Sequence, residues 1–321
     1  MLHYCDKAVT AKLGMSDLKA LILLALLALG AASANAAERF PCAADSRDGR
    51  AASVRTVETT LAGVPAILRV PPSIRKPPIV LWHGLGPPAS EADLMKDLPL
   101  DDVPAVKVYL GLPLFGARTP AAGEESLAQR QAQDYGLKIF EPVVVGAARE
   151  LPTVLDELHK LGCLRPHDKV GLFGFSAGGA AVLVALMDPR TPVSAAVTIN
   201  APSGLRSAVG ALERATKHPY AWSDASRQLA ARTDAAQHGT EVAGSASQPR
   251  ALLLFQGADD NMIAPADTLS LAESLRPVYQ RSGNERRLQL TIAPGISHNW
   301  ADPRTLAQAR TAVGDWFNRY L

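Results

Sequence analysis

The sequence predicts one α/β domain, a mostly parallel sheet with helices on both faces and a small helical insert. Short, continuously apolar runs alternate along the chain with segments of helical spacing, which is typical of parallel strands joined by covering helices. The clearest apolar run, residues 170–175, passes through a small-residue turn directly into an apolar helix. With 321 residues, 47% of them hydrophobic and 20% charged, the chain is long enough to bury a large core.

The first 36 residues have the pattern of a secretory signal peptide. Residues 18–29 form an apolar run with a lysine near its start, and Ala34-Asn35-Ala36 gives the small-x-small pattern of a cleavage site. The run is short for a bilayer span and no second such run follows, so we expect no stable membrane span after cleavage. The mature chain is expected to begin near Ala37 and to be periplasmic or secreted. A retained anchor is the alternative, and Met15 is an alternative start.

Charge and cysteine content limit the partners. The formal net charge is +2, and removing residues 1–36, with three lysines and two aspartates, leaves +1. With no basic stripe or charge run, neither nucleic acid nor an anionic membrane surface is expected as the main partner. Removal of the leader also removes Cys5, so Cys42 and Cys163 remain in a compartment that tolerates disulfides. A bridge between these two and a pair of unrelated buried thiols are both compatible with the sequence.

The start of the domain predicts a hairpin at a sheet edge. Residues 37–52 are polar and lack periodicity, as a linker does, and we place the domain at 53–321. Residues 54–61 alternate between apolar and polar side chains like a half-exposed strand, and Gly63 separates them from a second strand at 64–70. The two strands are expected to pair antiparallel.

Apolar runs and helical spacing predict the remaining elements. Buried strands are expected at 79–82, 105–110, 170–175, 193–199, 251–255 and 288–292. Helices are expected at 127–162, 177–187, 266–281 and 305–321. Pro142 and Pro152 should kink or divide the first of these helices. Residues 200–250 are rich in alanine, arginine and polar side chains without a strand-like run, which predicts a small helical insert.

The strand at 170–175 ends in a G-x-S-x-G turn, from Gly174 to Gly178, that points to a nucleophile. Such a turn holds Ser176 in strained backbone geometry, so only small side chains fit two residues on either side. It presents the hydroxyl beyond the sheet edge, beside the Ala177 N–H at the helix start, which can donate to a developing oxyanion. The same short pattern also occurs in loops and helix caps, but the strand before it and the helix after it favour a nucleophile.

Two further residue types follow where such a nucleophile needs them. Asp259 and Asp260 come after the strand at 251–255, and His298 comes after the strand at 288–292. Ligands of open parallel sheets bind beyond the carboxyl ends of the strands. A serine hydroxyl becomes nucleophilic when an imidazole takes its proton, and a carboxylate orients that imidazole and stabilises the imidazolium.

Over roughly residue 64 to the C-terminus, these features resemble the α/β-hydrolase superfamily. The elbow G-F-S-A-G-G is similar to those of secreted esterases, dienelactone-hydrolase-like proteins and prolyl-oligopeptidase-type catalytic domains. The resemblance implies an α/β-hydrolase fold with an eight-stranded sheet and a triad of Ser176, Asp260 and His298. It also implies an oxyanion hole made by the backbone N–H groups of Ala177 and Leu85, with Gly84 as the alternative to Leu85.

The chain departs from the family pattern at two loops. The acid loop, 257–265, has one extra residue before its proline, and counting from its first glycine favours Asp260 over Asp259. Residues 83–86 read H-G-L-G in place of H-G-G-G, which speaks against the hormone-sensitive-lipase-like branch. His83 belongs to this oxyanion loop and is expected to bond backbone groups and not to act as the base.

The resemblance also implies a cap and its substrate contacts. Inserts at the position of residues 200–250 commonly cover the site in this superfamily, so Tyr220 and Trp222 are expected to contact substrate. Phe115, in the glycine- and proline-rich loop at 111–123, is another expected wall of the pocket. The remaining histidines lack the paired spacing of a zinc site, and neither a metal nor another cofactor is expected.

Together these features predict a serine hydrolase that cleaves a carboxylic ester of a small molecule. Ser176 would attack the acyl carbon, His298 would pass the proton to the departing alcohol, and water would cleave the acyl-enzyme. A prolyl-oligopeptidase-like serine peptidase is the first alternative, weakened because few mature residues precede the first strand, too few for a propeller. A non-catalytic hydrolase-fold binding protein is the second.

Overall fold

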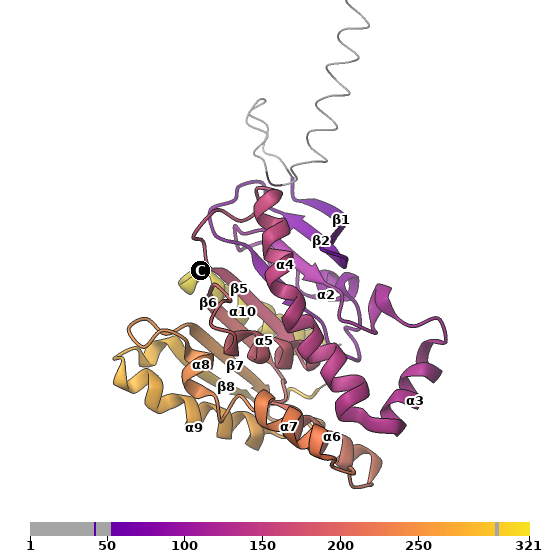
Figure 1. Ribbon diagram of the computed structural model, residues 1–321. Helices are drawn as coiled ribbons and strands as arrows, with labels where there is room; N and C mark the ends of the chain where they lie inside the picture. The colour runs from indigo at the N-terminus through magenta and orange to yellow at the C-terminus, as the bar shows by residue number, and fades with distance from the viewer. Residues whose placement is uncertain (1–41, 43–52, 299–301) are drawn as a thin grey trace, which may run out of the picture.

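The computed structural model describes residues 42, 53–298 and 302–321, and in this part of the chain eight strands form one sheet (Figure 1). The strand order is β1-β2-β4-β3-β5-β6-β7-β8. The edge strands β1 (Arg55–Leu61) and β2 (Val64–Val70) form the antiparallel hairpin that the sequence predicts, and β2 is also antiparallel to β4. Every other neighbouring pair is parallel, which confirms the predicted fold class. The predicted signal peptide, and the predicted linker apart from Cys42, lie outside the described residues.

The central strands are buried on both faces, which explains their continuously apolar sequences. They are β3 (Ile79–Trp82), β4 (Lys107–Leu110), β5 (Val170–Phe175), β6 (Val193–Ile199) and β7 (Ala251–Gly257). The last strand, β8 (Leu288–Ala293), forms the other edge of the sheet and is mostly half-buried, so the expectation of a buried strand at 288–292 is wrong: an edge strand has a neighbour on one side only. Every residue of β5 and β7 is buried. Residues of β1 instead alternate between exposed and half-buried, because one face of this edge strand meets solvent.

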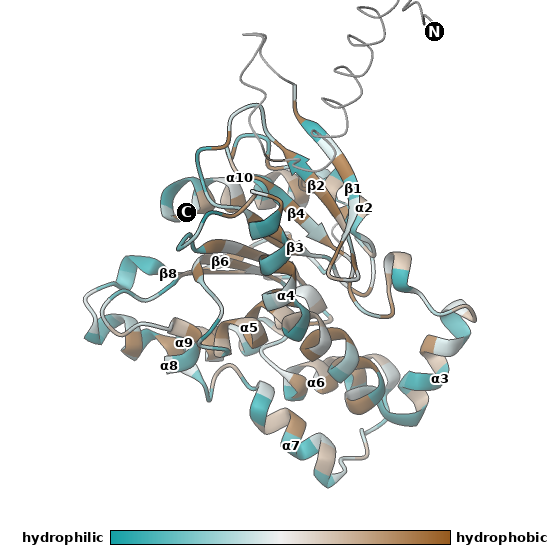
Figure 2. Ribbon diagram, turned by 45° about the horizontal axis from the view of Figure 1, so that its top comes forward, coloured by the Kyte–Doolittle hydropathy of each residue, from teal (hydrophilic) through white to brown (hydrophobic). Residues whose placement is uncertain are grey.

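Helices cover the sheet in two layers (Figure 1). On one face lie α2 (Glu91–Asp97) and α10 (Pro303–Tyr320); on the other lie α4 (Gly146–Lys160), α5 (Ala177–Met187), α8 (Gly239–Ala243) and α9 (Pro265–Arg281). In Figure 2, hydrophilic residues (teal) and hydrophobic residues (brown) alternate along α7 and α9, as is typical of amphipathic helices. Helix α2 is not among the helices predicted from the sequence, although Ser90 marks its start: the Ser90 hydroxyl accepts the Asp93 N–H at 3.1 Å.

The predicted helix at 127–162 is divided, but not at a proline. It consists of α3 (Gly123–Tyr135), a π-helix η2 (Gly136–Val145) and α4. The break lies at Asp134, whose backbone is non-helical (φ −168°, ψ 100°) and whose carboxylate accepts the Leu137 N–H at 2.9 Å. Pro142 lies inside η2, where the wider turn accommodates a residue without an N–H, and Pro152 lies inside α4.

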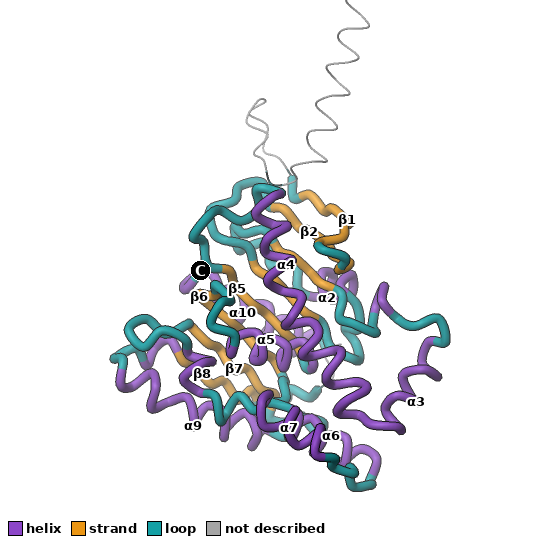
Figure 3. Tube along the Cα trace, in the orientation of Figure 1, coloured by secondary structure: helices purple, strands orange, loops and turns teal. Residues whose placement is uncertain are grey.

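Residues 200–250 fold into α6 (Leu205–Thr216), α7 (Asp224–Thr233) and α8. Figure 3 shows α6 and α7 beyond one end of the sheet, near the turn between α3 and η2. In contrast, α8 packs against α5 and α9 and belongs to the layer that covers the sheet. Short 3₁₀ turns occur at η1 (Gly116–Arg118) and η3 (Glu285–Arg287). Along the described residues, no helix combines the length and hydropathy that a membrane crossing requires.

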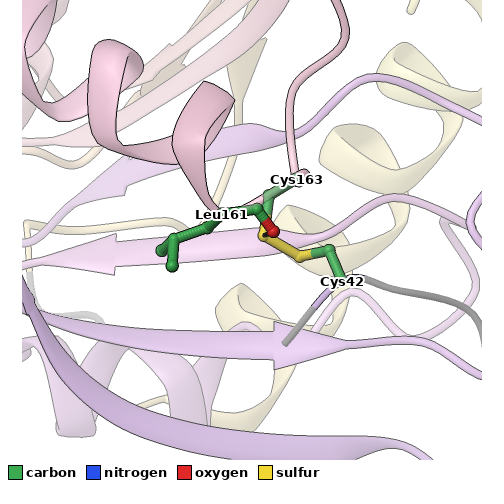
Figure 4. Close-up of a disulfide and its surroundings, with 3 residues drawn as sticks. All are labelled: Cys42, Leu161 and Cys163. Atoms are coloured by element: carbon green, nitrogen blue, oxygen red, sulfur yellow. Dashed lines mark hydrogen bonds between the residues drawn. A yellow bond between two sulfur atoms is a disulfide. The ribbon is translucent and has the colours of Figure 1, made fainter. Parts of the chain in front are cut away.

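A disulfide joins Cys42 to Cys163, the first of the two alternatives that the sequence left open (Figure 4). The two Cα atoms are 5.0 Å apart, and both cysteines are buried. Cys163 lies in the loop between α4 and β5, so the bridge ties the chain before β1 to the loop that leads into β5.

Loss of this bridge in Cys163→Ser is expected to lower the free energy of unfolding by about 2–5 kcal/mol. The bridge spans 121 residues of sequence, and closing so long a loop restricts the unfolded chain strongly. Urea unfolding of the unreduced proteins measures the difference. Cys42→Ser and the double variant should match the single variant, because each removes the same bond. Equal unfolding midpoints for the wild type and all three variants would contradict the prediction.

Candidate active site

Ser176 lies at the predicted sharp turn between β5 and α5. Its backbone has φ 52° and ψ −119°, a conformation that is unfavourable for a residue with a side chain. A Cβ on Gly174 would lie 2.2 Å from the Gly178 carbonyl oxygen, and one on Gly178 would lie 2.4 Å from the His83 carbonyl oxygen. Both positions therefore require glycine, and the backbone conformation of the turn exposes the serine hydroxyl.

Three side chains from distant parts of the chain form a hydrogen-bonded line at this turn. The His298 Nε2 lies 3.1 Å from the Ser176 Oγ, and its Nδ1 lies 2.8 Å from the Asp260 Oδ2. An ionised carboxylate only accepts hydrogen bonds, so Nδ1 carries the proton and Nε2 is left to accept the serine O–H. The Asp260 side chain is fully buried and that of His298 is 13% exposed. The arrangement can activate the hydroxyl as a nucleophile.

The carboxylate of Asp260 is held by the loop that carries it. Its Oδ1 accepts the N–H groups of Met262 and Ile263, both at 2.8 Å, and its Oδ2 also accepts the Gln256 amide at 3.1 Å. These bonds orient the second oxygen toward the imidazole. Asp259 is exposed, so of the two candidate aspartates the structure brings Asp260 to His298.

Two backbone N–H groups are available beside the serine. Ala177 is the first residue of α5, where an N–H has no acceptor within the helix, and Leu85 follows β3. Both residues line the same cavity as Ser176, and within the described chain neither N–H has a hydrogen-bond acceptor. The Gly84 N–H donates to the Pro88 carbonyl at 3.1 Å, so it is not free for an oxyanion. The geometry thus favours Leu85 over Gly84.

His83 orients the oxyanion loop through two hydrogen bonds of its ring. Its Nε2 accepts the Leu112 N–H at 3.1 Å, so its Nδ1 carries the proton and donates it to the Gly84 carbonyl at 2.7 Å. That carbonyl and the Leu85 N–H belong to one trans peptide and point in opposite directions. By holding the carbonyl, His83 sets the direction of the Leu85 N–H. The ring is completely buried, and this burial lowers the pKa of His83 to about 4.

Because of this low pKa, we expect the free energy of unfolding to fall less steeply with decreasing pH in His83→Asn than in the wild type. The unfolded chain takes up a proton at His83 near pH 6.5, whereas the folded chain resists protonation until about pH 4. The stability that the neutral ring provides is therefore present above pH 6.5 and is lost progressively as the pH falls to 4. Urea unfolding at pH 7, 5.5 and 4.5 measures this slope. His167→Asn, at an exposed loop position, is the matched control and should keep the wild-type slope.

A cavity of about 650 Å³ opens onto the serine. One wall is η2, with Ile139 and Val143, and the facing wall is α6, with Ala208 and Ala211. The side chains that line it in the described chain are mostly apolar, and His298 is the sole imidazole among them. Among the described residues, no group of three or more His, Cys, Asp and Glu side chains is placed to hold a metal ion.

The three aromatic residues expected to contact substrate do not line this cavity in the described structure. Phe115 packs against the core of the domain instead. The Tyr220 hydroxyl donates to the Asp134 carboxylate, and the Tyr220 ring meets Trp222 edge to face at 4.9 Å. The bond to Asp134 holds the tyrosine at the break between α3 and η2, and substrate contact by the three aromatic side chains stays a prediction.

Further polar contacts hold the cap helices α6 and α7 to the domain. Arg214 of α6 donates to the Met262 carbonyl at 2.7 Å, and so binds the acid loop directly. Arg232 of α7 forms an ion pair with Glu141 of η2 at 2.6 Å. Together with the Tyr220 contact, these bonds tie the cap to the acid loop, to η2 and to the end of α3.

The cavity wall that η2 provides is not among the features predicted from the sequence. The segment contains Ile139, Phe140, Val143 and Val144, all buried, within six residues. At helical spacing these four side chains share one stripe, but Val145, which is also buried, lies outside it, and this extra width was the available signal.

Comparisons with known proteins agree with this geometry. The prolyl oligopeptidase family (Peptidase_S9) matches residues 146–321, more than half of the chain. No curated protein matches the sequence. Among solved structures, TT1662 from Thermus thermophilus is similar with a TM-score of 0.61 and 20% identity, over 82% of this chain and 98% of that one.

Two other solved structures share the fold. Dienelactone hydrolase from Anabaena variabilis has a TM-score of 0.52 and 18% identity, over 84% of this chain and 100% of that one. Dipeptidyl peptidase 4 from Porphyromonas gingivalis has a TM-score of 0.56 and 16% identity, over 84% of this chain and 35% of that one. The eight-stranded sheet, the serine turn and the family match lead to one conclusion: the chain is an α/β-hydrolase of the serine hydrolase type and belongs to the prolyl oligopeptidase family.

Proposed function

We propose that the protein hydrolyses carboxylic esters of small molecules through a triad of Ser176, His298 and Asp260. The observation that carries the proposal is the unbroken line of hydrogen bonds from the buried carboxylate through the imidazole to the serine. The serine Oγ attacks the acyl carbon while Nε2 takes its proton, and the resulting oxyanion accepts the N–H groups of Leu85 and Ala177. The imidazolium then protonates the leaving alcohol, and a water activated by the same imidazole releases the acid.

The lining of the cavity favours an ester over a peptide terminus. In the described structure, no Lys, Arg, Asp or Glu side chain lines it. A peptidase that anchors the terminal ammonium or carboxylate of its substrate needs an opposite charge to offset the loss of hydration. A neutral ester needs none. The second candidate, a serine peptidase, is favoured by the family match itself.

Labelling with a fluorophosphonate and a comparison of substrates test the proposal. We expect the probe to modify wild-type protein, and we expect p-nitrophenyl acetate to be cleaved while prolyl and alanyl p-nitroanilides are not. If the protein cleaves the anilides and does not cleave the esters, it is a serine peptidase and the proposal is wrong. Folded wild-type protein that takes up no label would favour a binding protein.

We further infer a periplasmic or secreted location. The signal-peptide pattern of residues 1–36 supports it, and a structural disulfide is typical of oxidising compartments. N-terminal sequencing of the exported protein should begin at or near Ala37, and a start at Met1 or Met15 would contradict leader removal.

A further inference from the structure

We propose that an uncharged apolar chain of the ester lies along α6, and that the small side chains of this helix set its length. The inference rests on the proposed function and names the substrate class. Ala208, Ala211 and Ala215 all line the cavity. They are three and four residues apart, so they share one face of α6.

This alanine face runs from the floor of the cavity to its mouth. Ala208 is 3% exposed, Ala211 is half-buried and Ala215 is exposed. Opposite the floor, Ile139 and Val143 of η2 are 4% and 0% exposed. The three methyl groups thus border a channel that deepens along the helix, and any larger side chain on this face would shorten it.

Apart from Tyr135, Ser297 and the reacting Ser176 and His298, the polar lining residues gather at the mouth. Gln131, Thr216 and Asn261 are all exposed, whereas the deep walls are apolar. A charged chain would lose its hydration there without gaining a partner. Protein interiors seldom leave apolar space of about 650 Å³ unfilled, and pockets of this size hold small organic ligands. The chemistry that fits is a neutral alkyl or aryl chain.

Two series of esters test the substrate class. In one, p-nitrophenol is kept and the acyl chain grows from acetate; in the other, acetate is kept and the alcohol grows. In one series kcat/KM should rise about threefold to fourfold with each methylene until the cavity is full. The series that rises shows which side of the ester the cavity holds. The p-nitrophenyl monoester of succinate, which carries a carboxylate, should react about tenfold or more slowly than the butyrate.

Substitutions along α6 test the role of the helix. Ala211→Phe should lower kcat/KM for the preferred long ester by about tenfold or more and change that for acetate by less than about twofold. Gly210→Ala is the matched control, because a Cβ there would meet only the Arg214 side chain, and it should keep the wild-type profile.

The failures of the two proposals are distinguishable. Wild-type protein that neither takes up the fluorophosphonate nor cleaves any ester would overturn the proposed function. Protein that is labelled and cleaves acetate, but whose kcat/KM is flat or falls in both series, would overturn this inference alone. Equal losses for short and long esters in a labelled Ala211→Phe variant would do the same.

Independently, the geometry points to Asn200 as a positioning residue for the triad. It follows β6 in the left-handed conformation (φ 50°) and is 2% exposed. Its Oδ1 accepts the Gly257 N–H at 2.7 Å, and its Nδ2 donates to the Ser297 carbonyl at 3.0 Å. Only one orientation of the amide satisfies both bonds.

These bonds connect the segments that carry the three reacting side chains. Gly257 begins the loop of Asp260, and Ser297 directly precedes His298. The residue before Asn200, Ile199, accepts the Ser176 N–H at 2.9 Å. The end of β6 therefore sets the spacing of all three.

Asn200→Gly keeps the left-handed backbone and removes the amide. We expect kcat to fall about 10- to 100-fold while KM changes by less than about twofold, because the imidazole loses its alignment and the cavity is unaltered. The rate of fluorophosphonate labelling should fall in parallel. Asn200→Asp, which sets a carboxylate oxygen against the Ser297 carbonyl, should also lose kcat.

Thr198→Val, at a buried position of the same strand, is the control and should keep the wild-type kcat. A lower free energy of unfolding with unchanged kcat and labelling rate in both Asn200 variants would show a structural role only and overturn the assignment.

Discussion

Ser176→Ala is expected to lower kcat for ester hydrolysis by about 10⁵- to 10⁶-fold, the loss that removal of a triad nucleophile causes in serine hydrolases. The variant lacks the oxygen that His298 Nε2 faces at 3.1 Å, so no acyl-enzyme can form. The residual rate would come from binding and from the N–H groups of Leu85 and Ala177. Burst kinetics with p-nitrophenyl acetate, together with fluorophosphonate labelling, measure the effect.

Alanine keeps the side-chain bulk of serine at Cβ, so the strained turn at φ 52° should fold as before. Circular dichroism and urea unfolding of Ser176→Ala should therefore match the wild type. A folded variant that retains more than about 1% of the wild-type kcat would show that another group is the nucleophile.

Asp260→Asn should lower kcat about 10⁴-fold, whereas Asp259→Asn should change it by less than about twofold. The carboxylate of Asp260 accepts the proton of His298 Nδ1 at 2.8 Å and so leaves Nε2 free to act as the base. An amide at residue 260 can donate to Nδ1 instead, which selects the tautomer that carries its proton on Nε2 and cannot accept one from serine. Initial rates with p-nitrophenyl acetate at pH 7.5 compare the two variants.

Asp259→Asn is a matched control for Asp260→Asn, because Asp259 is exposed and lies one residue away. Both variants remove one negative charge from the same loop, so a long-range effect of charge would appear in both. Equal losses of activity would contradict the assignment of the acid. A larger loss in Asp259→Asn would reverse it.

Local rules predict the sheet and the serine turn well. A parallel strand buried on both faces needs a continuous apolar run, so β5 and β7 are evident in the sequence. The glycines at 174 and 178 are required by backbone atoms within a few residues or on the adjacent β3 loop. The requirement for glycine at these two positions comes from the serine turn itself and from the loop after β3, and the fold class already determines where both lie.

Features that depend on distant partners could not be predicted in the same way. The direction of Tyr220 is decided by Asp134, 86 residues earlier in the chain. The break at Asp134 depends on the side-chain bond to Leu137, which competes with the helix. Whether Leu85 or Gly84 supplies the second oxyanion donor depends on the Pro88 carbonyl, which accepts the Gly84 N–H. The residue types at 84 and 85 do not reveal this bond. The triad residues could be proposed from the sequence, whereas the walls of their cavity could not.

The bonds that hold the cap have a consequence for how substrate arrives. Arg214 ties α6 to the acid loop, and Arg232 ties α7 to η2, so swinging the cap outward would disturb the loop that orients Asp260. We therefore expect dissolved substrate to enter and leave through the opening of the cavity near the exposed residues Thr216 and Met262. The rate of ester hydrolysis should rise smoothly with the concentration of dissolved ester. It should not increase abruptly when the ester forms micelles, as the rate does for enzymes whose active site is covered by a mobile lid.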